Sequence, residues 1–143
     1  MSPNVATRVV LVVDDDESLR TMIARALQPS YEVHEARDGS IALALLDRIA
    51  VPYAIVCDVT MPGLDGFELG RRVKRSPKLR DVPIIFLTAR TSGVDIVEAM
   101  NVGAAHYILK PFSVRELRDK LDNLEKPDKP DKPDKPGQST PPT

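Results

Sequence analysis

The chain has 143 residues, of which 42% are hydrophobic and 29% are charged, and this balance fits one globular domain rather than two. Its formal net charge is -1 at pH 7, which argues against a nucleic-acid or membrane surface as partner. Cys57 is the only cysteine, which excludes an internal disulfide and a cysteine-based metal site and favours a reducing compartment. Residues 1–8 lack the apolar segment of a signal peptide, so we expect a cytoplasmic protein.

The first half of the chain alternates predicted strands and helices. Residues 9–13 form a continuous β-branched run, which is typical of a strand buried on both faces. An apolar stripe at 19–27 follows an acidic triplet and predicts a helix. Residues 31–36 alternate polar and apolar, which predicts a half-exposed edge strand, and the stripe at 41–49 predicts a second helix closed by Pro52.

Three more strand and helix pairs follow in the second half. The strands are continuous apolar runs at 53–57, 83–87 and 106–109. The helices are apolar stripes at 67–74, 94–102 and 114–124. Asp65 and Ser113 are the expected N-caps of two of these helices, and Gly103 is expected to end the helix before it.

Five consecutive strand-then-helix units predict an open α/β sandwich, with a parallel sheet covered on both faces through right-handed crossovers. The chain is too short for the eight units of a closed barrel. Residues 7–125 therefore form the expected domain. From 126 to 143 a Lys-Pro-Asp repeat forbids a continuous helix and offers no apolar residue for a core, so we expect a disordered tail or linker. Its favoured role is to keep the domain soluble or to act as a spacer, and docking to a partner is the alternative.

Polar residues directly follow four of the predicted strands, where ligands bind in an open parallel sheet. These are the acidic triplet Asp14-Asp15-Asp16, then Asp58, Thr88 and Lys110. Taken singly, the triplet could cap a helix, Thr88 could be an ordinary strand-end hydroxyl and Lys110 a solvated lysine. Their joint placement favours one shared site. Clustered carboxylates, with no His or Cys among these strand-end residues, favour Mg²⁺, with Mn²⁺ as a substitute.

Four segments together resemble the receiver domain of two-component response regulators. They are Val12-Val13-Asp14-Asp15-Asp16, then Asp58 with Met61-Pro62-Gly63-Leu64-Asp65-Gly66, then Leu87-Thr88-Ala89, and finally Gly103-Ala104 continuing to Tyr107-Ile108-Leu109-Lys110-Pro111-Phe112. The resemblance covers roughly residues 7–125 in order and with the expected spacing. It implies a flavodoxin-like (βα)5 three-layer sandwich with the parallel sheet order 2-1-3-4-5.

The resemblance also implies a role for each strand-end residue. Asp58 is the expected phosphoacceptor, which takes its phosphoryl group from a phosphohistidine. Asp14, Asp15 and Asp58 are expected to hold Mg²⁺ together with the backbone carbonyl of Thr60. Lys110 is expected to pair with one phosphoryl oxygen and the Thr88 hydroxyl to donate to another, which suits a reaction catalysed by positioning and charge stabilisation.

A conformational switch is implied as well. Phosphorylation is expected to draw Thr88 towards Asp58, after which Tyr107 rotates inward, although an aromatic residue on the last strand also has a plain core interpretation. The Lys110-Pro111 peptide bond is expected to be cis. Arg90 and Thr60 supply no carboxylate to orient a hydrolytic water, which predicts unremarkable to slow self-dephosphorylation.

The leading hypothesis is a stand-alone receiver, or a relay intermediate, that signals by a conformational switch and is not an enzyme. Its expected partners are a histidine kinase or histidine phosphotransfer protein and an unknown target protein, without nucleic acid or membrane, and its expected state is a monomer or weak dimer. One alternative is the amino-terminal fragment of a larger effector. A remote one is an Mg²⁺-dependent aspartyl-phosphate phosphohydrolase, which Thr60 disfavours because such enzymes need a carboxylate at that position.

Overall fold

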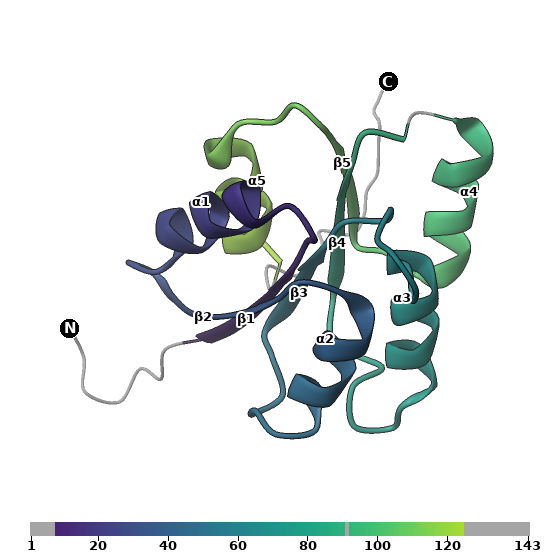
Figure 1. The fold of residues 1–143 in the computed structure, drawn as a ribbon, viewed down its shortest axis with the longest axis horizontal. Helices are drawn as coiled ribbons and strands as arrows, with labels where there is room; N and C mark the ends of the chain where they lie inside the picture. Colours follow the sequence, from purple (N-terminus) through teal and green to yellow (C-terminus); the bar gives the residue numbers. More distant parts are fainter. Residues whose placement is uncertain (1–7, 91, 125–143) are drawn as a thin grey trace.

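The computed structural model describes residues 8–90 and 92–124, in which five strands alternate with five helices (Figure 1). The elements are β1 (Arg8–Val13), α1 (Glu17–Leu27), β2 (Tyr31–Ala36), α2 (Gly39–Leu46), β3 (Ala54–Cys57), α3 (Gly66–Arg75), β4 (Ile84–Thr88), α4 (Gly93–Val102), β5 (His106–Leu109) and α5 (Val114–Asp122). The predicted tail at 126–143 lies outside the described residues, and the boundary at 7–125 stays a prediction. Among the helices described, none is both long and apolar enough to cross a membrane.

All strand pairs are parallel and the sheet order is β2-β1-β3-β4-β5, which confirms the expected fold and the edge position of β2. The register matters for the site. Val13 is level with Cys57, so Asp14 and Asp58 leave neighbouring strands at the same height. Thr88 is likewise level with Leu109, which brings Lys110 to the same edge.

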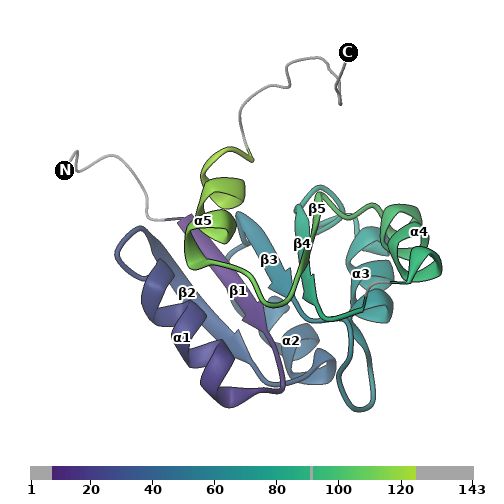
Figure 2. The same ribbon diagram turned by 90° about the horizontal axis from the view of Figure 1, so that it is seen from above.

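Helices α2, α3 and α4 cover one face of the sheet, and α1 and α5 cover the other (Figures 1 and 2). Alternate residues of each strand belong to the apolar clusters on opposite faces. Leu11 of β1 and Phe86 of β4 pack towards α2, α3 and α4, whereas Val12 of β1 and Ile85 of β4 pack towards α1 and α5. These side chains are nearly or completely buried. Burial of a large aliphatic side chain stabilises a fold by roughly 1.5–3 kcal/mol, so the two apolar layers hold the strand ends in place.

Local signals in the sequence set the helix boundaries. Each helix begins after an Asp or Ser whose side chain accepts a hydrogen bond from a backbone N–H of the first turn. The expected N-caps Asp65 and Ser113 are confirmed. Gly103 ends α4 with a φ of 94°, in the left-handed region that glycine adopts most easily.

Two predicted helices end earlier than expected. The stripe at 41–49 predicts a helix through Ile49, but α2 ends at Leu46, where the N–H groups of Arg48 and Ile49 both donate to the Leu45 carbonyl in a tight turn. Ile49 still packs against the core from that turn. Similarly, α5 ends at Asp122, and Leu124 packs against the α1 and α5 layer from beyond the helix.

Candidate functional site

Three carboxylates gather at the carboxyl edge of the sheet. Asp14, Asp15 and Asp58 each offer an oxygen within 4.8 Å of the others. Asp14 is 2% exposed and Asp58 8% exposed, whereas Asp15 lies on the surface. The first two follow β1 and β3, whose ends are hydrogen-bonded neighbours: the Asp58 N–H donates to the Val13 carbonyl at 2.9 Å. The structure therefore unites the three carboxylates that the sequence predicts as metal ligands.

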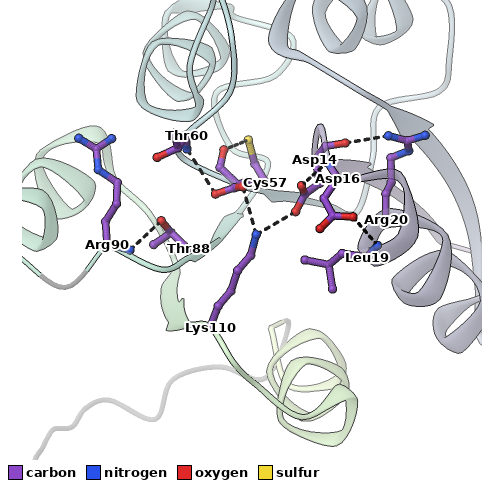
Figure 3. A network of polar contacts seen from close by, with 10 residues as sticks. Asp14, Asp16, Leu19, Arg20, Cys57, Thr60, Thr88, Arg90 and Lys110 are labelled. Atoms are coloured by element: carbon purple, nitrogen blue, oxygen red, sulfur yellow. Dashed lines mark hydrogen bonds and ion pairs between the residues drawn. The ribbon is translucent and has the colours of Figure 1, made fainter.

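Lys110 lies between the two buried carboxylates. Its Nζ donates to Asp58 Oδ2 at 3.1 Å and to Asp14 Oδ2 at 3.2 Å, across the end of the sheet (Figure 3). Burial works to lower the pKa of Lys110, but the hydrogen bond and charge of Asp58, together with Asp14, outweigh burial and raise it. The ammonium therefore stays charged beside the acidic group. The peptide bond to Pro111 is cis, as predicted.

Asp14 is fixed by contacts on both its side chain and its backbone. Its Oδ1 accepts the Asp16 N–H at 2.9 Å, and its carbonyl accepts a hydrogen bond from Arg20 Nη1 at 2.8 Å. Burial raises the pKa of Asp14, and the charge of Asp58 adds to that effect, while Asp16 and Lys110 oppose it. Helical periodicity places Arg20 in α1 but gives no signal that it holds Asp14, so this contact was missed from the sequence.

The loop after β3 wraps closely around Asp58. Asp58 Oδ1 accepts the Thr60 N–H at 3.3 Å, and the Gly66 N–H donates to the Val59 carbonyl at 2.8 Å. A Cβ at Gly66 would lie 2.8 Å from the Val59 Cα atom and closer still to the Asp58 carbonyl oxygen. Only glycine lets α3 begin this close to Asp58, because the obstructing atoms belong to the backbone.

The side chains of Thr88 and Tyr107 are both hydrogen-bonded to the backbone of Arg90. The buried Thr88 hydroxyl accepts the Arg90 N–H at 3.1 Å (Figure 3), and the Tyr107 hydroxyl donates to the Arg90 carbonyl at 2.9 Å. The Tyr107 ring makes an edge contact with Phe86 at a centroid distance of 6.5 Å. Tyr107 therefore has the packing contacts expected of a core residue and a polar link towards Thr88.

The donor set fits a hard divalent cation. Three carboxylates from two adjacent loops supply oxygen ligands, and no histidine or cysteine joins the cluster found among the described residues. Cys57 is buried behind the site, where its Sγ contacts the Asp58 carbonyl. The sequence-based preference for Mg²⁺ thus agrees with the chemistry of the residues that the fold brings together.

Comparison with known proteins gives one consistent family. The response regulator receiver domain matches residues 10–122. The phosphate regulon transcriptional regulatory protein PhoB of Pseudomonas aeruginosa is 43% identical over 116 residues, which are 80% of this chain and 50% of that protein. The chain spans about half the length of the curated transcriptional regulators that it matches.

Solved structures of similar chains agree in fold. Chemotaxis protein CheY4 of Vibrio cholerae has a TM-score of 0.78 and 37% identity, covering 83% of this chain and 99% of that one. The receiver domain of sensor histidine kinase PA1611 of Pseudomonas aeruginosa, solved with a magnesium ion in its active site cleft, has a TM-score of 0.74 and 32% identity over 82% of this chain and 97% of that one. The chain belongs to the response regulator receiver domain family, a family of signalling domains.

Proposed function

We propose that the chain accepts a phosphoryl group on Asp58 from the phosphohistidine of a histidine kinase or histidine phosphotransfer protein, in an Mg²⁺-dependent reaction. The observation that carries this proposal is the position of Lys110 Nζ within hydrogen-bonding distance of both Asp14 and Asp58. A cation and an acidic cluster around one strand-end carboxylate provide the charge balance that phosphoryl transfer requires.

In the proposed transfer, an Asp58 carboxylate oxygen forms a bond to phosphorus while the phosphorus–nitrogen bond of the donor breaks. The electron pair of that bond remains on the imidazole nitrogen, and Asp58 becomes a mixed anhydride. The nucleophile is a carboxylate oxygen, which has no proton to lose when it attacks, so the reaction needs no general base on this chain. Catalysis then depends on how the surrounding groups hold the phosphoryl oxygens.

Each neighbouring group has a task in this proposal. Lys110 would move its ammonium from the two carboxylates to a phosphoryl oxygen, and the Thr88 hydroxyl, which uses a lone pair to accept the Arg90 N–H, keeps its own proton to donate. Asp14, Asp15, Asp58 and the Thr60 carbonyl would hold the metal. Bound there, Mg²⁺ would neutralise the carboxylates and the incoming negative charge.

Thr88 and Tyr107 would transmit the effect of phosphorylation from Asp58 to the protein surface. Movement of the Thr88 hydroxyl towards the phosphoryl group would disturb the Arg90 amide, and the Arg90 carbonyl is the acceptor of the Tyr107 hydroxyl. Rotation of Tyr107 would then change the surface formed by α4 and β5, where a downstream protein would bind. We propose a cytoplasmic receiver that works as a monomer or weak dimer, without nucleic-acid contacts of its own.

A second candidate is the receiver portion of a larger effector. It is favoured by one specific observation, the chain's span of about half the length of the transcriptional regulators that it matches. The chemistry at Asp58 would be the same in both candidates, and only the recipient of the signal would differ.

The test is incubation with acetyl phosphate and Mg²⁺, followed by measurement of the intact mass. We expect the wild type to gain one labile phosphoryl adduct, and expect Asp58→Asn to gain none. Asp47→Asn is the matched control, since Asp47 lies exposed at the end of α2 away from the site. Failure of the wild type to form the adduct, or an equal adduct on Asp58→Asn, would show the proposal to be wrong.

A further inference from the structure

The backbone of Arg90 is hydrogen-bonded to both residues of the proposed switch, Thr88 and Tyr107. Its N–H donates to the Thr88 hydroxyl at 3.1 Å and its carbonyl accepts from the Tyr107 hydroxyl at 2.9 Å. Thr88 ends β4, and Tyr107 lies on the neighbouring strand β5. Any displacement of the Arg90 peptide therefore changes the surroundings of both hydroxyl groups at once.

The side chain of Arg90 ties the same residue to two helices. Its Nη2 lies 3.3 Å from Asp95 Oδ1 in the first turn of α4, and its guanidinium lies over the Phe67 ring of α3 at 5.8 Å from the centroid. Arg90 and Asp95 also act electrically on Tyr107: burial raises the pKa of Tyr107, Asp95 raises it further, and Arg90 lowers it. Arg90, Asp95 and Tyr107 thus form one local cluster of polar groups.

An exposed ion pair alone contributes little to stability, and the Arg90 side chain is 41% exposed. The geometry of this pair is nevertheless specific, because it connects the residue that holds Thr88 to the helix that follows. Phe67, which lies under the guanidinium, packs edge-on against Phe86, and Phe86 packs against Tyr107, so a chain of ring contacts connects the guanidinium to Tyr107. The contacts of the guanidinium with Asp95 and Phe67 therefore both restrain the Arg90 peptide.

We propose that Arg90 is a positioning residue for Thr88: its guanidinium, held by Asp95 and Phe67, fixes the Arg90 peptide, so that the Arg90 N–H holds the Thr88 hydroxyl in place at the end of β4 and the Arg90 carbonyl remains the acceptor of the Tyr107 hydroxyl. This inference rests on the proposed function of Asp58. It assigns the coupling between the site and α4 to a side chain that touches neither the phosphoryl group nor the metal ligands.

The test compares Arg90→Ala, Arg90→Lys and Asp95→Asn with the wild type. The control is Arg72→Ala, an exposed arginine of α3 that is paired with Glu68. One measurement is the initial rate of adduct formation from acetyl phosphate with Mg²⁺. The other is the set of ring resonances of Tyr107 in NMR spectra, with and without beryllofluoride as phosphoryl mimic. Tyr31 and Tyr53, which stack on each other, serve as internal references.

Arg90→Ala is expected to slow adduct formation about three- to tenfold, the size found when a residue modulates the coupling between two sites. The Tyr107 resonances should shift or broaden in the free protein and respond less to beryllofluoride. Asp95→Asn should act in the same direction, Arg90→Lys should restore part of both signals, and Arg72→Ala should change neither.

Wild-type rates and unchanged Tyr107 resonances in Arg90→Ala and Asp95→Asn would overturn the inference. Equal effects of Arg72→Ala and Arg90→Ala would also overturn it, because they would indicate a general effect of charge. If the wild type formed no adduct, the proposed function would fail, and the Tyr107 resonances of the free protein would still decide whether Arg90 positions Thr88 and Tyr107.

Discussion

Lys110 Nζ lies 3.1 Å from Asp58 Oδ2, although the two residues follow different strands and are 52 positions apart in the chain. In the sheet order, β4 lies between β3, which Asp58 follows, and β5, which Lys110 follows. The long side chain of Lys110 bridges this gap at the carboxyl edge of the sheet. The same ammonium also contacts Asp14. One cation therefore stabilises two buried carboxylates.

Lys110→Met is expected to destabilise the metal-free protein by about 1–3 kcal/mol, because it leaves charged buried groups without their partner. Added Mg²⁺ should recover much of this loss, since the metal replaces the missing positive charge. Phosphoryl uptake should still fall by about a hundredfold, the effect of losing one group that stabilises transition-state charge. Urea unfolding with and without Mg²⁺ measures the first effect. Lys78→Met is the control, since Lys78 is an exposed lysine whose Nζ donates to the Leu46 carbonyl at the end of α2. Equal stability of Lys110→Met and wild type without metal would contradict the first expectation.

Asp14→Asn is expected to have the opposite effect on stability. Burial raises the pKa of Asp14 in the folded state, so ionising this carboxyl group is less favourable in the folded chain than in the unfolded chain. Its contribution to stability is fully present below its ordinary pKa and is lost as the pH rises through the folded value. Asparagine keeps an oxygen for the Asp16 N–H and removes the charge. We expect the free energy of unfolding of the metal-free protein to rise by about 0.5–2 kcal/mol, the range usual for a single stabilising substitution. Thermal unfolding should also show a smaller stabilisation by Mg²⁺, and a less stable metal-free variant would count against this account.

Gly66→Ala and Gly93→Ala form a matched pair. A Cβ at Gly66 would collide with the backbone of Asp58 and Val59, whereas a Cβ at Gly93 would meet no atom within 4 Å. We expect Gly66→Ala to lose about 1–3 kcal/mol through overpacking and to accept phosphoryl groups poorly. Gly93→Ala, at the start of α4, should be neutral or slightly stabilising. Urea midpoints and adduct formation test both, and similar behaviour of the two variants would be evidence against the close approach at Asp58.

His106 should make stability depend on pH. Partial burial lowers its pKa, and the charge of Lys120 adds to that shift. A histidine with a lowered folded pKa binds protons more readily when unfolded, so its contribution to stability is present above its ordinary pKa of about 6.5 and is lost as pH falls through the folded value. His106→Gln should therefore weaken the loss of stability between about pH 7.5 and pH 5. Urea unfolding at several pH values measures this, and an unchanged pH dependence would refute it.

Much of the architecture could be predicted from local sequence. Continuous β-branched runs such as 9–13 indicate strands buried on both faces, because both faces must exclude water. Capping residues such as Asp65 and Ser113 mark helix starts, because their side chains satisfy free backbone N–H groups. The end of α2 at Leu46 was not predictable, because the apolar stripe continues to Ile49 while the backbone turns after Leu46.

The sequence by itself determined the strands, the edge character of β2 and the polar residues at the strand ends, because these depend on side-chain periodicity and on residue types next to one another. Only the tertiary structure decided which atoms meet: Lys110 with Asp14 and Asp58, Arg20 with the Asp14 carbonyl, and Arg90 between Thr88 and Tyr107. Those contacts depend on register and crossovers between segments far apart in the chain, which no local pattern encodes.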